Sequence, residues 1–227
     1  MDMAYTDKAM EECIAKIDEY MEYELTEKRI RHTEGVVETA LKLAEKYGAD
    51  PDKALLAAKC HDVCRKWEDE RMNAFVTLNQ LGDQYMNNIN LSHSKAAAHV
   101  AKVAFKISDE DILNAISYHT TGRAGMSLLE KIIFIADAVE PNRDYPGVDA
   151  LREAVRDDLD KACLMSLRST REYVLSQGIE LDGDTQEAIE WFEAGAPEEG
   201  YPKKKENEQD DSLMNLDELD LSDLMMF

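Results

Sequence analysis

Residues 54–64 read ALLAAKCHDVC and residues 132–139 read IIFIADAV, and these two apolar stretches decide the fold. In both, apolar residues recur at helical spacing, and each stretch carries a carboxylate, Asp62 in the first and Asp137 in the second. No convincing strand pattern, with apolar and polar residues in alternation, is found elsewhere in the sequence. The sequence therefore predicts an all-α protein in which each carboxylate interrupts an apolar helix.

Helix start and stop signals divide the rest of the chain into short, closely linked helices. The expected N-caps are Asp50, Ser92, Ser108 and Ser127. A helix after Glu34 is expected to end at Gly48, and the helix that Asp50 opens is expected to run past Asp62. Two further helices are expected over about 157–176 and 185–193.

The charge of the chain excludes several classes of partner. Its 227 residues include 26 Lys and Arg against 48 Asp and Glu, a formal net charge of −22. A surface this acidic repels nucleic-acid backbones and anionic membranes, so we expect neither DNA, RNA nor membrane as a partner. No apolar run is long enough to span a bilayer, and the charged N-terminus does not resemble a signal peptide. The expected location is the cytoplasm.

A shift in composition predicts where the folded domain ends. We expect one domain over residues 1–195 and an acidic, disordered C-terminal tail over 196–227, which holds 10 acidic residues and 3 lysines. Leucines recur among the acids between Leu213 and Leu224, a pattern that a groove on another protein could fold into a helix. The tail is therefore either without function or the docking segment for a protein partner.

Histidines and carboxylates suggest a metal site. A buried carboxylate is costly unless it is paired or binds a metal, which applies to both Asp62 and Asp137. Imidazole nitrogens and carboxylate oxygens together suit divalent transition metals. The six candidate ligands are His32, His61, Asp62, His93, His119 and Asp137. His99 is set apart as structural, because on one helix it is rotated by roughly 120° from His93.

The order of these residues resembles the HD-domain metal-dependent phosphohydrolases, and four local strings resemble the YqeK type of that family. The strings are RIRHTEGVVETALKLAEKYGAD (29–50), KCHDVCRKW (59–67), AISYHTTGRAGMSLLEKIIFIADAVEPNRDYPGVDALR (115–152) and DLDKACLMSLRSTREYVLSQG (158–178). The resemblance runs from about Glu27 to Phe192. It implies an HD-domain helical bundle that cleaves diadenosine tetraphosphate symmetrically into two ADP.

The resemblance also implies a dinuclear metal site. One metal would be held by His32, His61, Asp62 and Asp137 and the second by His93 and His119, with Asp62 bridging the two. Iron is the expected metal, and manganese, cobalt, nickel and zinc are alternatives. A shared water between the two ions would be the nucleophile.

Local cations are needed to hold a phosphate substrate on an acidic protein. We expect Asp62 and Lys66 to be catalytic. Lys66 lies four residues after Asp62 on nearly the same helical face, and Arg123 follows His119 through a short turn. The residues expected to bind substrate are Arg31, Lys66, Thr120, Thr121, Arg123 and Arg143.

Two other functions remain open at this stage. A related HD phosphohydrolase could act on another nucleotide, a guanosine alarmone or a cyclic dinucleotide, because fold and ligands would look alike. A non-catalytic, nucleotide-sensing module that recruits a partner through the acidic tail is the alternative of another class. The oligomeric state is open too, with a homodimer as one alternative.

Overall fold

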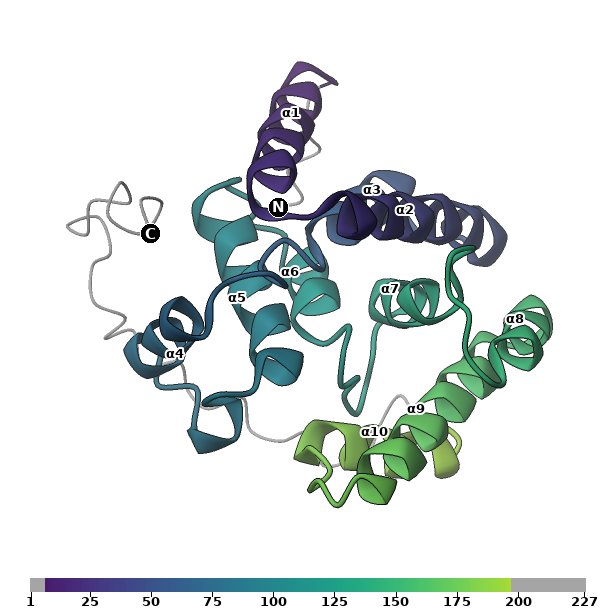
Figure 1. Cartoon of the computed structure of the whole chain (residues 1–227). Coiled ribbons are helices and arrows are strands. Elements are labelled where there is room, and N and C mark those ends of the chain that lie inside the picture. The colour runs from purple at the N-terminus through teal and green to yellow at the C-terminus, as the bar shows by residue number, and fades with distance from the viewer. Residues whose placement is uncertain (1–6, 197–227) are drawn as a thin grey trace.

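The computed structural model describes residues 7–196, and this part of the chain is entirely helices, turns and loops, which confirms the all-α prediction (Figure 1). The helices are α1 (Asp7–Glu24), α2 (Glu27–Tyr47), α3 (Pro51–Cys60), α4 (Asp69–Leu78), the 3₁₀ helix η1 (Asp83–Tyr85), α5 (Ile89–Val103), α6 (Glu110–Ser117), α7 (Leu128–Val139), α8 (Val148–Asp157), α9 (Leu159–Ser176) and α10 (Gly183–Glu193). Of the predicted tail, all but Ala196 lies outside the described residues.

Several predicted boundaries are confirmed. Helix α2 ends at Gly48, whose φ of 79° is left-handed and whose N–H donates to the carbonyl of Ala44. The Asp50 carboxylate caps α3 by accepting from the N–H groups of Asp52 and Lys53. Ser127 caps α7 in a complete capping box, in which the Glu130 carboxylate accepts from the Ser127 N–H in return.

Other boundaries were predicted wrongly. Ser92 does not cap α5, which begins at Ile89; its hydroxyl is buried and donates to the carbonyl of Asn88. The cap of α6 is Asp109 and not Ser108, because the Asp109 carboxylate accepts from two N–H groups of the first turn. Helix α10 begins at Gly183, two residues earlier than predicted.

Helix α3 also ends earlier than predicted. Its last residue is Cys60, and the chain continues through tight turns in which the N–H groups of Val63, Arg65 and Trp67 each donate to a carbonyl three residues earlier. His61 and Asp62 therefore lie at the C-terminal end of the helix and not in its interior. Both side chains are buried, with His61 fully enclosed and Asp62 3% exposed.

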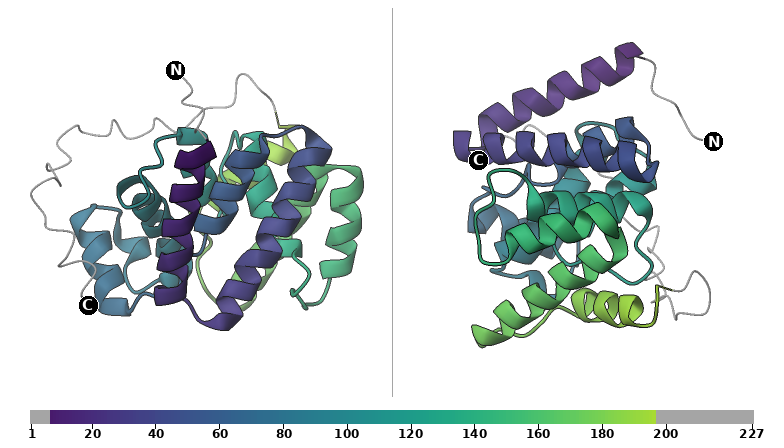
Figure 2. Two further views of the ribbon diagram at one scale, coloured as in Figure 1. Left: turned by 90° about the horizontal axis from the view of Figure 1, so that it is seen from above. Right: turned by 90° about the vertical axis from the view of Figure 1, so that its right-hand side faces the viewer.

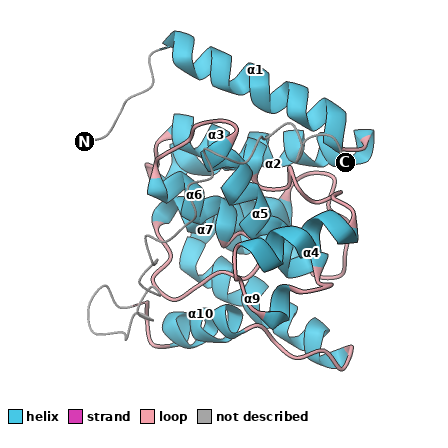
Figure 3. Cartoon of the chain, turned by 90° about the vertical axis from the view of Figure 1, so that its left-hand side faces the viewer, coloured by secondary structure: helices cyan, strands magenta, loops and turns pink. Residues whose placement is uncertain are grey.

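Helix α7 is the centre of the fold. Ile132 to Ala136 are consecutive buried residues, as expected of a helix covered on all sides. It packs against α2, α3, α6, α8 and α9. Figures 2 and 3 show α1 across one outer face and α9 with α10 on the opposite one. Of the elements that carry the six candidate ligands, α2, α3 and α6 pack against α7, and α5 packs against α3 and α6, so packing of the core brings those residues together.

Candidate metal centre

The structure brings all six predicted ligands into one cluster, although they come from five separate places in the chain. His32 lies on α2, His61 and Asp62 follow α3, and His93 lies on α5. His119 follows α6, and Asp137 lies in the last turn of α7. The four histidines and Asp62 are buried, and the Asp137 side chain is 22% exposed. His99 lies apart, with its ring 5.3 Å from that of Phe75 between centroids.

Each of the four histidines is fixed through Nδ1. Three of these nitrogens lie against backbone carbonyls: His61 at 2.6 Å from the oxygen of Ala58, His93 at 2.7 Å from Ile89 and His119 at 2.7 Å from Ile116. A carbonyl can only accept, so Nδ1 carries the proton and the lone pair is on Nε2. These short local bonds thus orient each ring toward the centre of the cluster.

The cluster divides into two groups on either side of Asp62. Oδ2 of Asp62 lies 3.9 Å from Nε2 of His32 and 3.9 Å from Nε2 of His61. Its other oxygen, Oδ1, lies 3.2 Å from Nε2 of His93 and 3.9 Å from Nε2 of His119. Asp137 belongs to the first group, with Oδ1 3.0 Å from Nε2 of His32 and 3.9 Å from that of His61. Asp62 therefore presents one oxygen to each group, as a bridging carboxylate would.

The chemistry of these donors fits a cation. Nε2 of His61 lies 3.4 Å from Nε2 of His32, and Nε2 of His93 lies 3.1 Å from Nε2 of His119. With Nδ1 protonated in neutral rings, each contact sets two lone pairs against each other, an arrangement that a shared positive charge relieves. Within the described residues, two sets of three meet the spacing for a metal ion: His32, His61 and Asp137, and His61, Asp62 and His119. The residues present fit divalent metal ions.

The ionisation of the cluster suits the same role. Burial lowers the pKa of His61, and it lowers the pKa of His119 to about 3, so both rings are neutral at neutral pH, as metal-binding imidazoles must be. Burial works against ionisation of Asp62, but His61 and His93 outweigh it and hold its pKa well below the ordinary value. His32 differs, because Asp137 and Glu140 outweigh the effect of burial and raise its pKa.

Glu140, which was not predicted from the sequence, supports the cluster from outside. Oε1 of its carboxylate lies 3.0 Å from Nδ1 of His32, and the side chain is 1% exposed. Oε2 accepts from the N–H of Asn142 at 2.7 Å and from its side-chain amide at 2.9 Å. Gly35 makes room for it, because a Cβ there would lie 2.3 Å from Oε2 of Glu140. A glutamate in EPN, just after an apolar helix that holds a ligand, was the available signal.

The predicted substrate residues lie in different surroundings. Thr120 lies at the cluster, with its hydroxyl oxygen 3.3 Å from Nε2 of His119. Arg143 donates to the carboxylate of Asp137 and, at 2.8 Å, to its carbonyl. Lys66 is exposed and lines a pocket near Asp62.

Three other predicted residues are engaged elsewhere. Thr121 is buried and donates to the carbonyl of Gly122. Arg123 donates to Glu130 at 2.6 Å and 3.2 Å and lies over the ring of Tyr118. Arg31 is exposed and pairs with exposed Glu27 at 3.5 Å. Sequence analysis did not single out Arg29, whose Nη1 donates to Oδ2 of Asp62 at 2.8 Å, or Arg65 three residues after Asp62.

Comparison with known proteins identifies the class. The HD domain model matches residues 29–142, a span that includes all six clustered ligands, and the chain belongs to the HD domain family. HD domains are metal-dependent, in keeping with the two sets of donors. The resemblance to the YqeK type is confirmed by relatives of 35% to 43% identity over most of the chain.

The more particular likeness is to one kind of enzyme. The chain is 38% identical over 174 residues to "Bis(5'-nucleosyl)-tetraphosphatase, symmetrical" of Bacillus subtilis, covering 76% of this chain and 94% of the relative. It is 43% identical over 163 residues to the protein of that name in Halalkalibacterium halodurans, covering 71% and 87%. A crystal structure from Clostridium acetobutylicum, described as a predicted HD superfamily hydrolase involved in NAD metabolism, superposes with a TM-score of 0.76 at 44% identity, covering 80% of this chain and 97% of the other.

Proposed function

We propose that this protein is a symmetrical bis(5′-nucleosyl)-tetraphosphatase, which hydrolyses diadenosine tetraphosphate to two ADP. The observation that carries the proposal is the placement of Asp62, with one oxygen toward His32 and His61 and the other toward His93 and His119. This arrangement belongs to a chain whose relatives over most of its length are named for that reaction.

We infer two divalent metal ions as cofactors. His32, His61 and Asp137 would hold one and His93 with His119 the other, and Asp62 would contribute an oxygen to each. When bound, such a pair lowers the pKa of a water molecule and neutralises charge on the phosphates. Iron is the metal we expect, and manganese, cobalt, nickel or zinc would suit the same imidazole and carboxylate donors.

Other residues of the chain would position the substrate. The Thr120 hydroxyl, beside His119, can donate to a phosphate oxygen at the centre of the cluster. Arg143 holds the Asp137 carboxylate in place, and its remaining N–H groups are donors suited to phosphate. Lys66 would supply positive charge at the pocket next to Asp62.

Product analysis tests the proposal. Purified, metal-loaded protein is incubated with diadenosine tetraphosphate in ¹⁸O-labelled water, and the product nucleotides are separated and analysed by mass spectrometry. The expected product is ADP alone, with label in one ADP of each pair, because one phosphoanhydride is cleaved by one water. Equal amounts of ATP and AMP, or no cleavage with any of the five metals, would overturn it. The comparisons favour this function over the other nucleotide substrates and the non-catalytic module.

The remaining inferences concern the chain outside the site. We propose that residues 1–195 form the catalytic domain, because every candidate site residue lies before residue 144. A protein that ends at Ala196 should keep its metal and its turnover rate, and loss of either would move the boundary. A homodimer, a protein partner for residues 196–227 and a cytoplasmic location are also proposals. Among the described residues, no helix is long and apolar enough to cross a membrane.

A further inference from the structure

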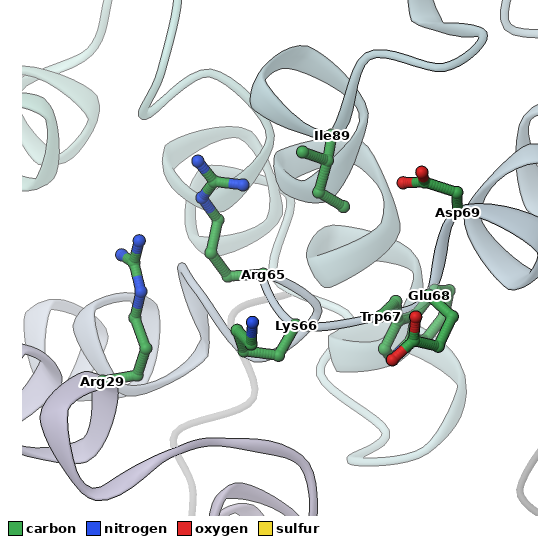
Figure 4. Close-up of a pocket in the computed structure, with 7 residues that line it drawn as sticks. All are labelled: Arg29, Arg65, Lys66, Trp67, Glu68, Asp69 and Ile89. Carbon is green, nitrogen blue, oxygen red and sulfur yellow. The ribbon is translucent and has the colours of Figure 1, made fainter.

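A pocket of about 310 Å³ lies beside the cluster, at the turn that follows Asp62. One side of it carries three cations, Arg29, Arg65 and Lys66. In Figure 4 the guanidinium groups of Arg29 and Arg65 point in the same direction, and Lys66 follows Arg65 in the chain. In a protein with a net charge of −22, three cations around one hollow mark a place for an anion.

The pocket is joined to the metal centre through Arg29. Its Nη1 donates to Oδ2 of Asp62 at 2.8 Å, while its side chain also lines the pocket and is 32% exposed. A substrate held at Asp62 could therefore extend past Arg29 without leaving a charged surface. Arg29 thus belongs both to the surroundings of Asp62 and to the wall of the pocket.

Arg65 is held in position within the pocket. It is partly buried, and its Nη2 donates to the side-chain oxygen of Asn90 at 2.6 Å. The pKa of Arg65 is lowered from its ordinary value, because the effects of burial and of the nearby charge on Arg29 outweigh the opposite effect of Asp62. An anion bound between Arg29 and Arg65, in addition to the Asp62 carboxylate, would offset the repulsion between the two guanidinium groups. Guanidinium groups are planar donors suited to phosphate oxygens.

The opposite rim of the pocket has the reverse charge. Glu68 and Asp69 line it, and both are exposed (Figure 4). Carboxylates repel phosphate but accept hydrogen bonds from hydroxyl groups. Moving away from Asp62, the pocket therefore presents first the basic side chains and then the two carboxylates. This sequence matches a ligand in which a phosphate is followed by a ribose.

We propose that this pocket binds the half of a dinucleoside polyphosphate that extends away from the metal centre, with a phosphate on Arg29 and Arg65 and ribose hydroxyls at Glu68 and Asp69. The inference rests on the proposed function and goes beyond it. Metal ions fix only the phosphates at the cleaved bond. Binding of the half that lies away from the metal centre would select a substrate with a nucleoside at each end. It would thereby favour cleavage of the central phosphoanhydride bond.

Binding of substrate analogues tests the assignment separately from catalysis. Metal-loaded wild type, Arg65→Gln and a Glu68→Gln/Asp69→Asn double variant are titrated by calorimetry with methylene-bridged diadenosine tetraphosphate and with inorganic tripolyphosphate. Arg65→Gln should weaken binding of both ligands about tenfold, the loss of one charge-assisted contact of ~1.4 kcal/mol. The double variant should weaken only the ligand that carries ribose. Lys28→Gln removes a charge from an exposed neighbour of Arg29 outside the pocket and is the control.

The outcomes separate this inference from the proposed function. If wild type cleaves diadenosine tetraphosphate but Arg65→Gln binds both ligands within twofold of wild type, the subsite is wrong and the function stands. If both variants weaken tripolyphosphate equally, the acidic rim does not contact ribose and that half of the assignment is overturned. If wild type fails to cleave the substrate, the proposed function fails whatever the analogue does. Metal content, measured for every variant, must equal that of wild type for the expected result to count as support.

Discussion

Glu140 places Oε1 of its carboxylate 3.0 Å from Nδ1 of His32, while Nε2 of the same ring faces the cluster. The pair joins the end of α7 to α2 across 108 residues of sequence. Because Nδ1 donates to Glu140, the lone pair of Nε2 points toward Asp62 and Asp137. Glu140 is thus a positioning residue, which acts on the proposed metal through His32.

Replacing Glu140 by glutamine should weaken metal binding about 10- to 100-fold. Every neighbour of the carboxylate is a donor, since His32 donates to one oxygen and Asn142 donates twice to the other. An amide must turn its NH₂ group toward one of these donors. Metal titration calorimetry measures the loss, and Glu38→Gln, an exposed glutamate on α2, is the matched control. Unchanged affinity in Glu140→Gln would remove the positioning role.

Asp62→Asn should release metal from both groups and lower turnover on the order of 10³-fold. The carboxylate faces both groups, so its loss removes an oxygen from each. Far-ultraviolet circular dichroism should stay unchanged, because the helices depend on apolar packing around α7. His99→Ala is the comparison, and it should keep its metal because His99 packs against Phe75. Asp62→Asn with full metal content would contradict the bridging role.

Arg123 was predicted from the sequence to hold phosphate, and its contacts predict a second effect on stability. Glu130 is 1% exposed and accepts two bonds from Arg123, so Arg123→Gln leaves a buried carboxylate without its cation. The expected cost is about 3 kcal/mol in the free energy of unfolding. Urea denaturation measures it, and Arg123→Gln/Glu130→Gln should recover part of the loss. If stability is unchanged while KM rises, phosphate binding is the main role of Arg123.

The lowered pKa of the Asp109 carboxyl makes the free energy of unfolding depend on pH. Burial opposes its ionisation, but the ion pair with Lys53 at 2.7 Å and the N–H groups it caps outweigh burial and lower the pKa of Asp109 from its ordinary value. A lowered folded-state pKa gives stability that is present above the unfolded value and is lost as pH falls through the folded value. Asp109→Asn keeps an oxygen that can cap α6 but loses the ion pair with Lys53, and should therefore cost about 0.5–1 kcal/mol at pH 7.

The same substitution should cost less at pH 3, which lies below the ordinary pKa of an aspartate, because the stability that ionised Asp109 provides is lost as the pH falls through its folded-state pKa. Urea denaturation at both pH values checks the difference between wild type and Asp109→Asn. Lys53→Gln is the second arm, and it should show the same trend because it removes the other partner of the pair. An equal cost at both pH values would mean that the lowered pKa of Asp109 does not contribute to folding.

Much of the architecture was predictable because its signals are local. Gly48, Asp50 and Ser127 act through hydrogen bonds within a few residues, so their sequence patterns are enough to place helix ends. Ser108 failed because Asp109, next to it, is an equally good cap and the chain can use only one. The end of α3 was predicted wrongly because the turns that follow it depend on where His61 and Asp62 lie in the core. That is a tertiary effect, which local sequence does not show.

The site shows the same division. The six clustered residues could be predicted because the carboxylates Asp62 and Asp137 in apolar stretches are costly without a partner, and the histidines are donors that suit a metal. Glu140, Arg29 and Arg65 were missed because a charged residue at a helix end or turn is ordinarily solvated, and only the packing of α2 against α7 and α3 places them beside the cluster. Arg31 shows the converse, since its nearness to His32 in sequence does not bring its side chain to the cluster.

The central claim is that Asp62 stands between two metal ions, and anomalous diffraction tests it most directly. Crystals grown with manganese or iron are measured at the absorption edge of the metal. Two anomalous peaks are expected, one beside His32, His61 and Asp137 and one beside His93 and His119, with an oxygen of Asp62 at each. A single peak, or two peaks of which Asp62 contacts neither, would contradict it.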